Sequence, residues 1–140
     1  SAMIGRNFLV GALAELEATR LISSLRMTQE YNRNSDYLRQ DEFPKITPKN
    51  ATLLKVNVYD YFYDFKSSDG KLNFERYYLP KNIRYAKSPQ TFSNGVLFLP
   101  SGNMYSFGTI GVIVNIAGKS AIRYVVIDRA GRVRLDRNAP

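Results

Sequence analysis

Apolar positions near the start of the chain follow the spacing of a helix. The run from Phe8 to Arg33 contains no proline and a single glycine, so nothing within it forces a helix to end. At about 1.5 Å per residue, this run predicts a helix roughly 40 Å long. Its apolar residues fall on two stripes, offset by more than a quarter of the helix circumference. The first stripe holds Leu9, Leu13 and Leu16, and the second holds Ala14, Ala18, Leu21, Ile22 and Leu25.

Two arrangements fit these offset stripes. In the first, a curved or partly frayed helix lies on one core. In the second, the C-terminal half of the helix packs on its own domain while the N-terminal half projects and meets another surface. Burying a side chain such as Leu21, Ile22 or Leu25 is worth roughly 1.5 to 3 kcal/mol. The second stripe is therefore expected to cover one face of a sheet.

The helical pattern weakens towards residue 36. Asn32 and the polar residues at 34–36 compete with helical hydrogen bonding through their short side chains. Pro44 and Pro48 each restrict their own backbone and that of the residue before them. We therefore assign residues 1–35 to an N-terminal helix and residues 36–50 to a connecting loop.

Beyond residue 50 the chain is rich in Val, Ile, Tyr, Phe and Thr and is punctuated by turn residues, which is typical of β-strands. Alternation in the run 52–65 changes phase, which indicates a bulge or a strand covered on both sides. No helix lies between the strands to make a parallel crossover. The sequence therefore predicts one α+β domain, with the long N-terminal helix packed on one or two antiparallel sheets. We expect a β-rich head at 51–140 with about six or seven strands. The strands are expected at 52–65, 72–79, 83–86, 96–99, 109–116 and 121–127, with a last strand ending at Leu135. Turns are expected at Asp69-Gly70, Asn94-Gly95, Pro100-Ser101-Gly102, Ala117-Gly118 and Ala130-Gly131.

Composition narrows the possible chemistry. The 140 residues include no cysteine and no histidine, which removes disulfides, thiolate zinc sites and the usual general base. A Ser-Lys or paired-carboxylate enzyme remains an alternative, but no residue spacing indicates one, so we assign no catalytic residues, no metal and no cofactor. The formal charge of +8 favours an anionic partner such as nucleic acid, anionic lipid or cell-wall polymer. Residues 1–3, Ser-Ala-Met, have the form of a cloning scar, so we expect that the natural N-terminus has been removed.

Several short motifs occur in a characteristic order. They are the helix segment 21–30, Leu79-Pro80 within 78–83, and the stretches 97–103, 108–110, 125–127 and 131–134. In order and spacing they resemble the type IV pilin-like proteins, most closely the GspH/FimT-like minor pilins and pseudopilins, including the Gram-positive competence pseudopilins. The helix segment resembles the C-terminal half of the pilin spine, and the later stretches resemble the family's C-terminal sheet.

The resemblance implies a structural and assembly role in a type IV pilus, competence or type II secretion filament. Other pilins would be the partners. A processed, methylated and apolar N-terminal segment, which is missing here, would anchor the protein in the cell membrane, with the head outside the cytoplasm. Leu9, Leu13 and Leu16 would then be a filament-assembly surface. Ordinary packing of these leucines within one chain is the alternative.

The last hairpin concentrates positive charge. Residues 119–137 hold six basic and two acidic side chains, which is half of the net charge of the chain. On a strand, Arg132 and Arg134 would lie about 6.7 Å apart on one face, where each guanidinium could take a phosphate. In FimT-like minor pilins a Gly-Arg-x-Arg element is associated with DNA capture for transformation, and residues 131–134 match it. A solvated sheet edge that avoids aggregation is the alternative. The candidate DNA-binding residues are Arg123, Arg129, Arg132, Arg134 and Arg137.

Overall fold

One helix and eight strands make up the described part of the chain. In this computed structural model, residues 2–34, 53–67, 73–87, 92, 95–104 and 107–140 are described. The elements are α1 (Ala2–Arg33), β1 (Leu54–Val58), β2 (Phe62–Ser67), β3 (Tyr77–Tyr78), β4 (Ile83–Lys87), β5 (Val96–Leu97), β6 (Gly108–Ile116), β7 (Lys119–Ile127) and β8 (Val133–Asp136).

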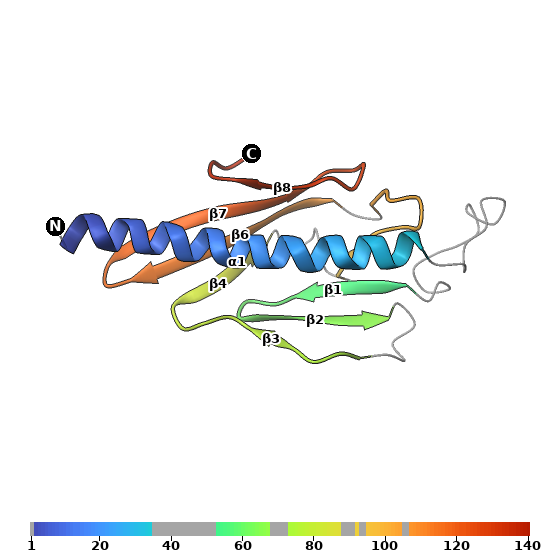
Figure 1. Ribbon diagram of the computed structural model, residues 1–140, viewed down its shortest axis with the longest axis horizontal. Coiled ribbons are helices and arrows are strands. Elements are labelled where there is room, and N and C mark those ends of the chain that lie inside the picture. Colours follow the sequence, from blue (N-terminus) through green and yellow to red (C-terminus); the bar gives the residue numbers. More distant parts are fainter. Residues whose placement is uncertain (1, 35–52, 68–72, 88–91, 93–94, 105–106) are drawn as a thin grey trace.

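The strands form two antiparallel sheets of four strands each. The first sheet has the order β3-β2-β1-β5, and the second has the order β4-β6-β7-β8. Figure 1 shows α1 running along both sheets, with β1 on one side of it, β8 and most of β7 on the other, and β6 crossing behind it. A long helix packed on antiparallel sheets confirms the predicted α+β class. The described residues contain eight strands, so the expected count of six or seven is wrong.

The extra strand arises within residues 52–65, which are not a single strand. β1 and β2 pair directly, with Val58 opposite Tyr63, and the Tyr59 amide donates to the carbonyl of Phe62 at 2.9 Å. The change of phase in the sequence is therefore a tight turn. This turn contains neither glycine nor proline, so Asp60 is its one turn-favouring residue, and a single aspartate does not separate a turn from a bulge.

Other predicted turns and strands are largely confirmed. Gly102 and Gly131 have positive φ angles of 90° and 85°, and the β6–β7 hairpin turns at Ala117-Gly118 with φ angles of 50° and 79°, as a two-residue turn between twisted strands requires. The predicted strand 72–79 is much shorter, because in its described part only β3 joins the ladder, beside a single bridge at Asn73. The predicted strand 96–99 is also shorter, since β5 ends at Leu97. The predicted loop 36–50, the Asp69-Gly70 turn and Asn94 of the Asn94-Gly95 turn lie outside the described residues.

The helix lies on the core from Val10 onwards. Val10 is 2% exposed and Ala14 is fully buried, and Ala18, Leu21 and Leu25 continue the same stripe at spacings of three or four residues. The N-terminal half of the helix therefore does not project from Val10 on, which corrects one of the two arrangements considered. Small alanines let the helix backbone approach the sheets closely where leucines could not.

Asn32 holds the last turn of the helix to the first sheet. Its side chain is fully buried. The amide nitrogen donates to the carbonyls of Leu54 and Phe98, each at 2.8 Å, and the amide oxygen accepts from the Leu54 backbone at 2.9 Å. Asn32 is thus part of the helix and bridges it to β1 and to the residue after β5, although its residue type weakened the helical pattern.

Candidate nucleic-acid interface

A groove lies between the C-terminal turns of α1 and the hairpin that joins β7 to β8. Its volume is about 710 Å³. Two arginines from the helix and two from the hairpin line it, against one acidic residue from each. They are Arg26, Arg33, Arg132 and Arg134, with Glu30 and Asp128. We call this surface the arginine groove, and these six side chains leave it with a net positive charge.

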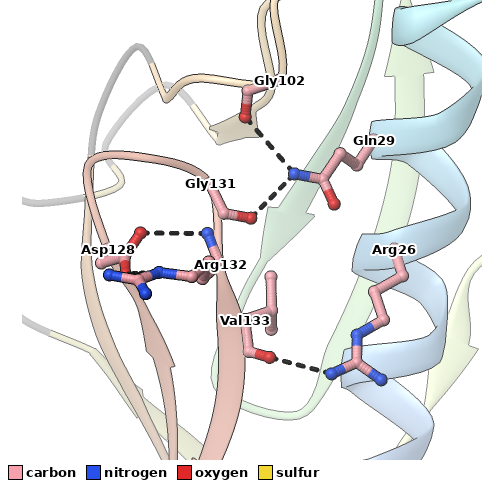
Figure 2. Close-up of polar contacts among 7 residues, drawn as sticks. All are labelled: Arg26, Gln29, Gly102, Asp128, Gly131, Arg132 and Val133. Carbon is pink, nitrogen blue, oxygen red and sulfur yellow. Dashed lines mark hydrogen bonds and ion pairs between the residues drawn. The ribbon is translucent and has the colours of Figure 1, made fainter.

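Hydrogen bonds from the helix to neighbouring backbone hold the groove together (Figure 2). The Gln29 Nε2 atom donates to the carbonyl oxygens of Gly131 at 2.7 Å and Gly102 at 3.3 Å. Arg26 Nη2 donates to the carbonyl of Val133 at 3.0 Å. Because a guanidinium has five N–H groups, most donors of Arg26 remain free for another acceptor.

Gly131 is required by this packing. Its φ angle of 85° lies in the left-handed region, and a β-carbon at this position would overlap the carbonyl oxygen of Gly102 and lie 2.8 Å from Gln29 Nε2. The glycine of the Gly-Arg-x-Arg element therefore lets the hairpin approach the helix. This approach brings the hairpin arginines beside those of the helix.

Arg132 is the most exposed of the hairpin arginines whose ion pairs are described. Its side chain is 84% exposed, and its Nε donates to Asp128 Oδ2 at 2.7 Å (Figure 2). The Arg132 backbone amide also donates to Asp128 Oδ1 at 3.0 Å, and this bond is the main reason that the pKa of Asp128 is lowered. Exposed ion pairs of this kind are screened by water and contribute little to stability. Arg132 could therefore exchange Asp128 for another anion at little cost.

Arg33 and Arg134 are paired more loosely. Arg33 lies 3.5 Å from Glu30 and Arg134 lies 3.8 Å from Asp136, and both arginine side chains are about half exposed. Val133 between the two hairpin arginines is buried, so Arg132 and Arg134 point away from the core as the strand pattern predicts. All four arginines are open to a ligand along the same groove.

Three of the predicted arginines lie elsewhere. Arg123 and Arg137 both contact the Glu15 carboxylate of α1, at 3.2 Å and 2.7 Å. The guanidinium of Arg129 lies over the ring of Phe107, with Cζ 4.8 Å from the ring centroid. Of the five candidates, the structure therefore brings only Arg132 and Arg134 into the arginine groove.

The helix arginines of the groove were missed by sequence reasoning. Arg26 and Arg33 are separated by seven residues, close to two helical turns, so they share one face of α1. That spacing was a usable signal. What the sequence could not supply is that this face lies beside a hairpin about one hundred residues later in the chain.

A second candidate surface runs along the outer side of α1. Leu9 and Leu16 are about half exposed, whereas Leu13 is partly buried and packs on the core. Met27 and Tyr31 are also about half exposed. Leu9, Leu16, Met27 and Tyr31 are spaced close to whole helical turns, so they form one line opposite the buried face. We call these four residues the outer stripe.

Under the middle of the helix lies a buried polar cluster. The Glu17 carboxylate is 2% exposed and accepts from the Tyr77 hydroxyl at 3.0 Å, while Arg20 contacts both groups. The Tyr63 hydroxyl lies 2.7 Å from Ser24 Oγ. Burial raises the pKa of Tyr63 and Tyr77, so both hydroxyls keep their protons at neutral pH. The cluster is thus suited to holding the helix on the first sheet.

Comparisons of the chain with protein-family models, curated proteins and solved structures give no match. Among the described residues, no helix has both the length and the apolar character needed to cross a membrane. The same residues contain no cluster of three acidic, histidine or cysteine side chains that could hold a metal ion. Functional inference therefore rests on the motifs of the sequence, the outer stripe and the arginine groove.

Proposed function

We propose that the chain is a filament subunit of the type IV pilin-like class, a minor pilin or pseudopilin that acts by assembly and not by catalysis. The observation that carries this proposal is the outer stripe. Its four apolar side chains lie along about 33 Å of helix, on the face that the sheets leave uncovered. Exposed apolar side chains aligned along a helix, here with Arg20 between Leu16 and Met27, are suited to packing against another helix by ridges and grooves.

The order of the elements supports the same proposal. A long helix precedes two antiparallel sheets, and the Leu79-Pro80 motif follows β3 directly. Of the stretches that resemble the family's C-terminal sheet, 108–110, 125–127 and 131–134 lie in or beside β6, β7 and β8, whereas 97–103 begins in β5 of the other sheet. In a type IV pilus, competence or type II secretion filament, Leu9 and Leu16 would contact neighbouring pilins. Leu13 would instead stabilise the head of its own chain.

The proposal also predicts what precedes the head in the natural protein. An apolar segment continuous with α1 would anchor the subunit in the cell membrane before assembly and would lie within the filament afterwards. Reading the native sequence upstream of residue 1 is the first test. A processed start with about twenty apolar residues agrees with the proposal, and an ordinary polar start refutes it.

The second test uses the full-length protein in cells that assemble its filament. Leu9→Glu/Leu16→Glu should abolish recovery of the subunit in sheared filaments, because two buried carboxylates would oppose helix packing. Thermal unfolding of the isolated head should change little, since both side chains are exposed. Asn103→Glu, an exposed change on a loop of the head, is the matched control and should leave assembly intact. Normal assembly of the Leu9→Glu/Leu16→Glu protein would refute the role of the outer stripe.

A second candidate function is DNA binding through the arginine groove, either in DNA uptake by such a filament or independently of one. The observation that favours it is the convergence of four arginines from two distant segments on one groove. Phosphate oxygens accept paired hydrogen bonds from guanidinium groups, and the contacts would follow the DNA backbone without reading its sequence.

This candidate is tested by fluorescence anisotropy with a labelled DNA duplex at several salt concentrations. Four phosphate contacts predict a slope of up to about −3.6 for the logarithm of the binding constant against the logarithm of salt concentration. Arg132→Ala/Arg134→Ala should abolish binding, and Arg33→Ala should weaken it. Arg129→Ala lies outside the groove and is the control. Absence of binding at low salt, or equal loss with Arg129→Ala, refutes this candidate.

A further inference from the structure

A second pocket lies where the chain crosses from one sheet to the other. The segment that joins β3 to β4 makes this crossing (Figure 1). Tyr61 from the β1–β2 turn, Lys81 and Asn82 from the crossing segment, Arg84 of β4 and Asn115 of β6 line a pocket of about 530 Å³. The arginine groove shares none of these residues.

The walls of this pocket are fixed by backbone hydrogen bonds. The Leu79 amide donates to the carbonyl of Tyr61 at 2.8 Å, and the Asn115 amide donates to the carbonyl of Asn82 at 3.0 Å. Asn82 adopts a positive φ of 71°, which a residue with a β-carbon uncommonly does. The pocket is therefore held in shape by both sheets and needs no ligand to form.

The positive charges in the pocket are not neutralised by other described residues. Every other arginine whose side chain the structure describes contacts a carboxylate, a carbonyl oxygen or an aromatic ring. Within the described ranges, Arg84 has no such contact, and Lys81 has none either. No acidic side chain lines the pocket. Two cations are thus available together for one anionic group.

The remaining lining residues suit a ring that carries hydroxyl groups. Tyr61 is 61% exposed, and in the described part of the chain its ring contacts no other aromatic ring, whereas the nearby Tyr59 and Phe62 stack on each other. The Asn115 amide oxygen already accepts from Ser120 Oγ at 3.0 Å, which leaves its amide nitrogen to donate. The open ring of Tyr61 offers an apolar face, and the two asparagines offer polar groups.

From this arrangement we propose that the pocket binds a sugar that carries a phosphate or a carboxylate. The anionic group would contact Lys81 and Arg84, with the guanidinium able to bind it in bidentate fashion. The apolar face of the sugar ring would pack on Tyr61, and Asn82 and Asn115 would bind its hydroxyls. This inference goes beyond the filament and DNA proposals and does not depend on either of them.

The test is a titration of the isotope-labelled protein followed by amide NMR. Glucose 6-phosphate and galacturonate represent the two anionic groups, and glucose and inorganic phosphate are the separate halves. At least one anionic sugar should shift the amides of residues 61, 79–84 and 113–115 with a Kd of about 1 mM. Glucose and inorganic phosphate should bind at least about tenfold more weakly. The anionic sugar that binds identifies the charged group.

Variants separate the parts of the site. Arg84→Gln and Lys81→Gln should each weaken binding of the anionic sugar about fivefold or more, and Tyr61→Ser should do so without changing the weak binding of phosphate alone. Arg132→Gln, in the arginine groove, should have no effect. All four changes are at exposed side chains, so amide spectra of the free variants should remain those of a folded protein. Binding of neither anionic sugar, equal binding of glucose, or equal loss with Arg132→Gln overturns the proposal.

Discussion

Replacing Asn32 with alanine should destabilise the protein far more than the same replacement normally does at an asparagine near the end of a helix. The change removes three hydrogen bonds between the helix and backbone groups of Leu54 and Phe98. Each such bond contributes about 0.5–1.5 kcal/mol net, so Asn32→Ala should lower the free energy of unfolding by about 1.5–4.5 kcal/mol. At about 3–5 °C per kcal/mol for a chain of this size, Tm should fall by roughly 5–20 °C.

Two further variants make the measurement specific. Asn34→Ala is the matched control, because the Asn34 side chain donates to Glu30 Oε1 at 3.2 Å on the surface, and its backbone hydrogen bond to the Glu30 carbonyl survives the change. Its effect should stay within about 0.5 kcal/mol. Asn32→Asp nearly preserves size and one acceptor but loses both donated bonds. It therefore separates the loss of hydrogen bonds from the creation of a cavity.

Urea unfolding followed by circular dichroism gives the free energies, and calorimetry gives Tm. The order expected for stability is wild type and Asn34→Ala together, with both Asn32 variants well below. If Asn32→Ala were no less stable than Asn34→Ala, the contacts of Asn32 would not hold the helix end to the first sheet. A stable Asn32→Asp beside an unstable Asn32→Ala would show that cavity formation, and not the donated hydrogen bonds, sets the loss.

Three further predictions concern the core, the glycine turn and the charge network. Leu25→Ala should cost roughly 2–5 kcal/mol in urea unfolding, and Leu16→Ala less than about 1 kcal/mol; similar losses would contradict the assignment of the two helix faces. Gly131→Ala should lower the free energy of unfolding by about 1–3 kcal/mol through backbone strain and steric overlap. The loss should exceed that of Gly118→Ala, whose added β-carbon would meet nothing within 4 Å. A stable Gly131→Ala protein would show that the hairpin can move away from the helix. The hydrogen bond from Arg123, followed by the charges of Arg137 and Arg123, lowers the pKa of Glu15 below its usual 4.5. The stability that ionised Glu15 contributes is therefore present above pH 4.5 and is lost as pH falls through its pKa in the folded protein. The Tm difference between wild type and Glu15→Gln should accordingly shrink in acid, and a difference unchanged down to pH 2 would contradict this account.

Local patterns in the sequence were sufficient for the elements themselves. The spacing of apolar residues predicts the helix up to Arg33, and glycines at 102, 118 and 131 mark turns that the structure contains. The segregation of one helix from many strands predicts the α+β class. These features depend on residues close together in the chain, where periodicity and turn chemistry act directly.

Contacts between segments that are far apart in the sequence could not be predicted from these local patterns. Asparagine weakens a helix, yet Asn32 lies buried in α1. Its side chain hydrogen-bonds to the backbone carbonyl of Phe98, far away in the sequence, and the periodicity of the helix carries no information about that contact. The alternation of the last strand predicts that Arg132 and Arg134 share one face, but Arg123 in β7 is paired with Glu15 of the helix instead. Which partner an arginine meets depends on strand register and helix placement.

By itself, the sequence determined one long helix followed by a β-rich head, a positive last hairpin and the alternation that exposes Arg132 and Arg134. Only the tertiary structure decided that Leu13 belongs to the core while Leu9 and Leu16 remain exposed, and that helix and hairpin arginines line one groove. The physical reason is that backbone periodicity is set by neighbouring residues, whereas burial and charge pairing are set by how whole elements pack.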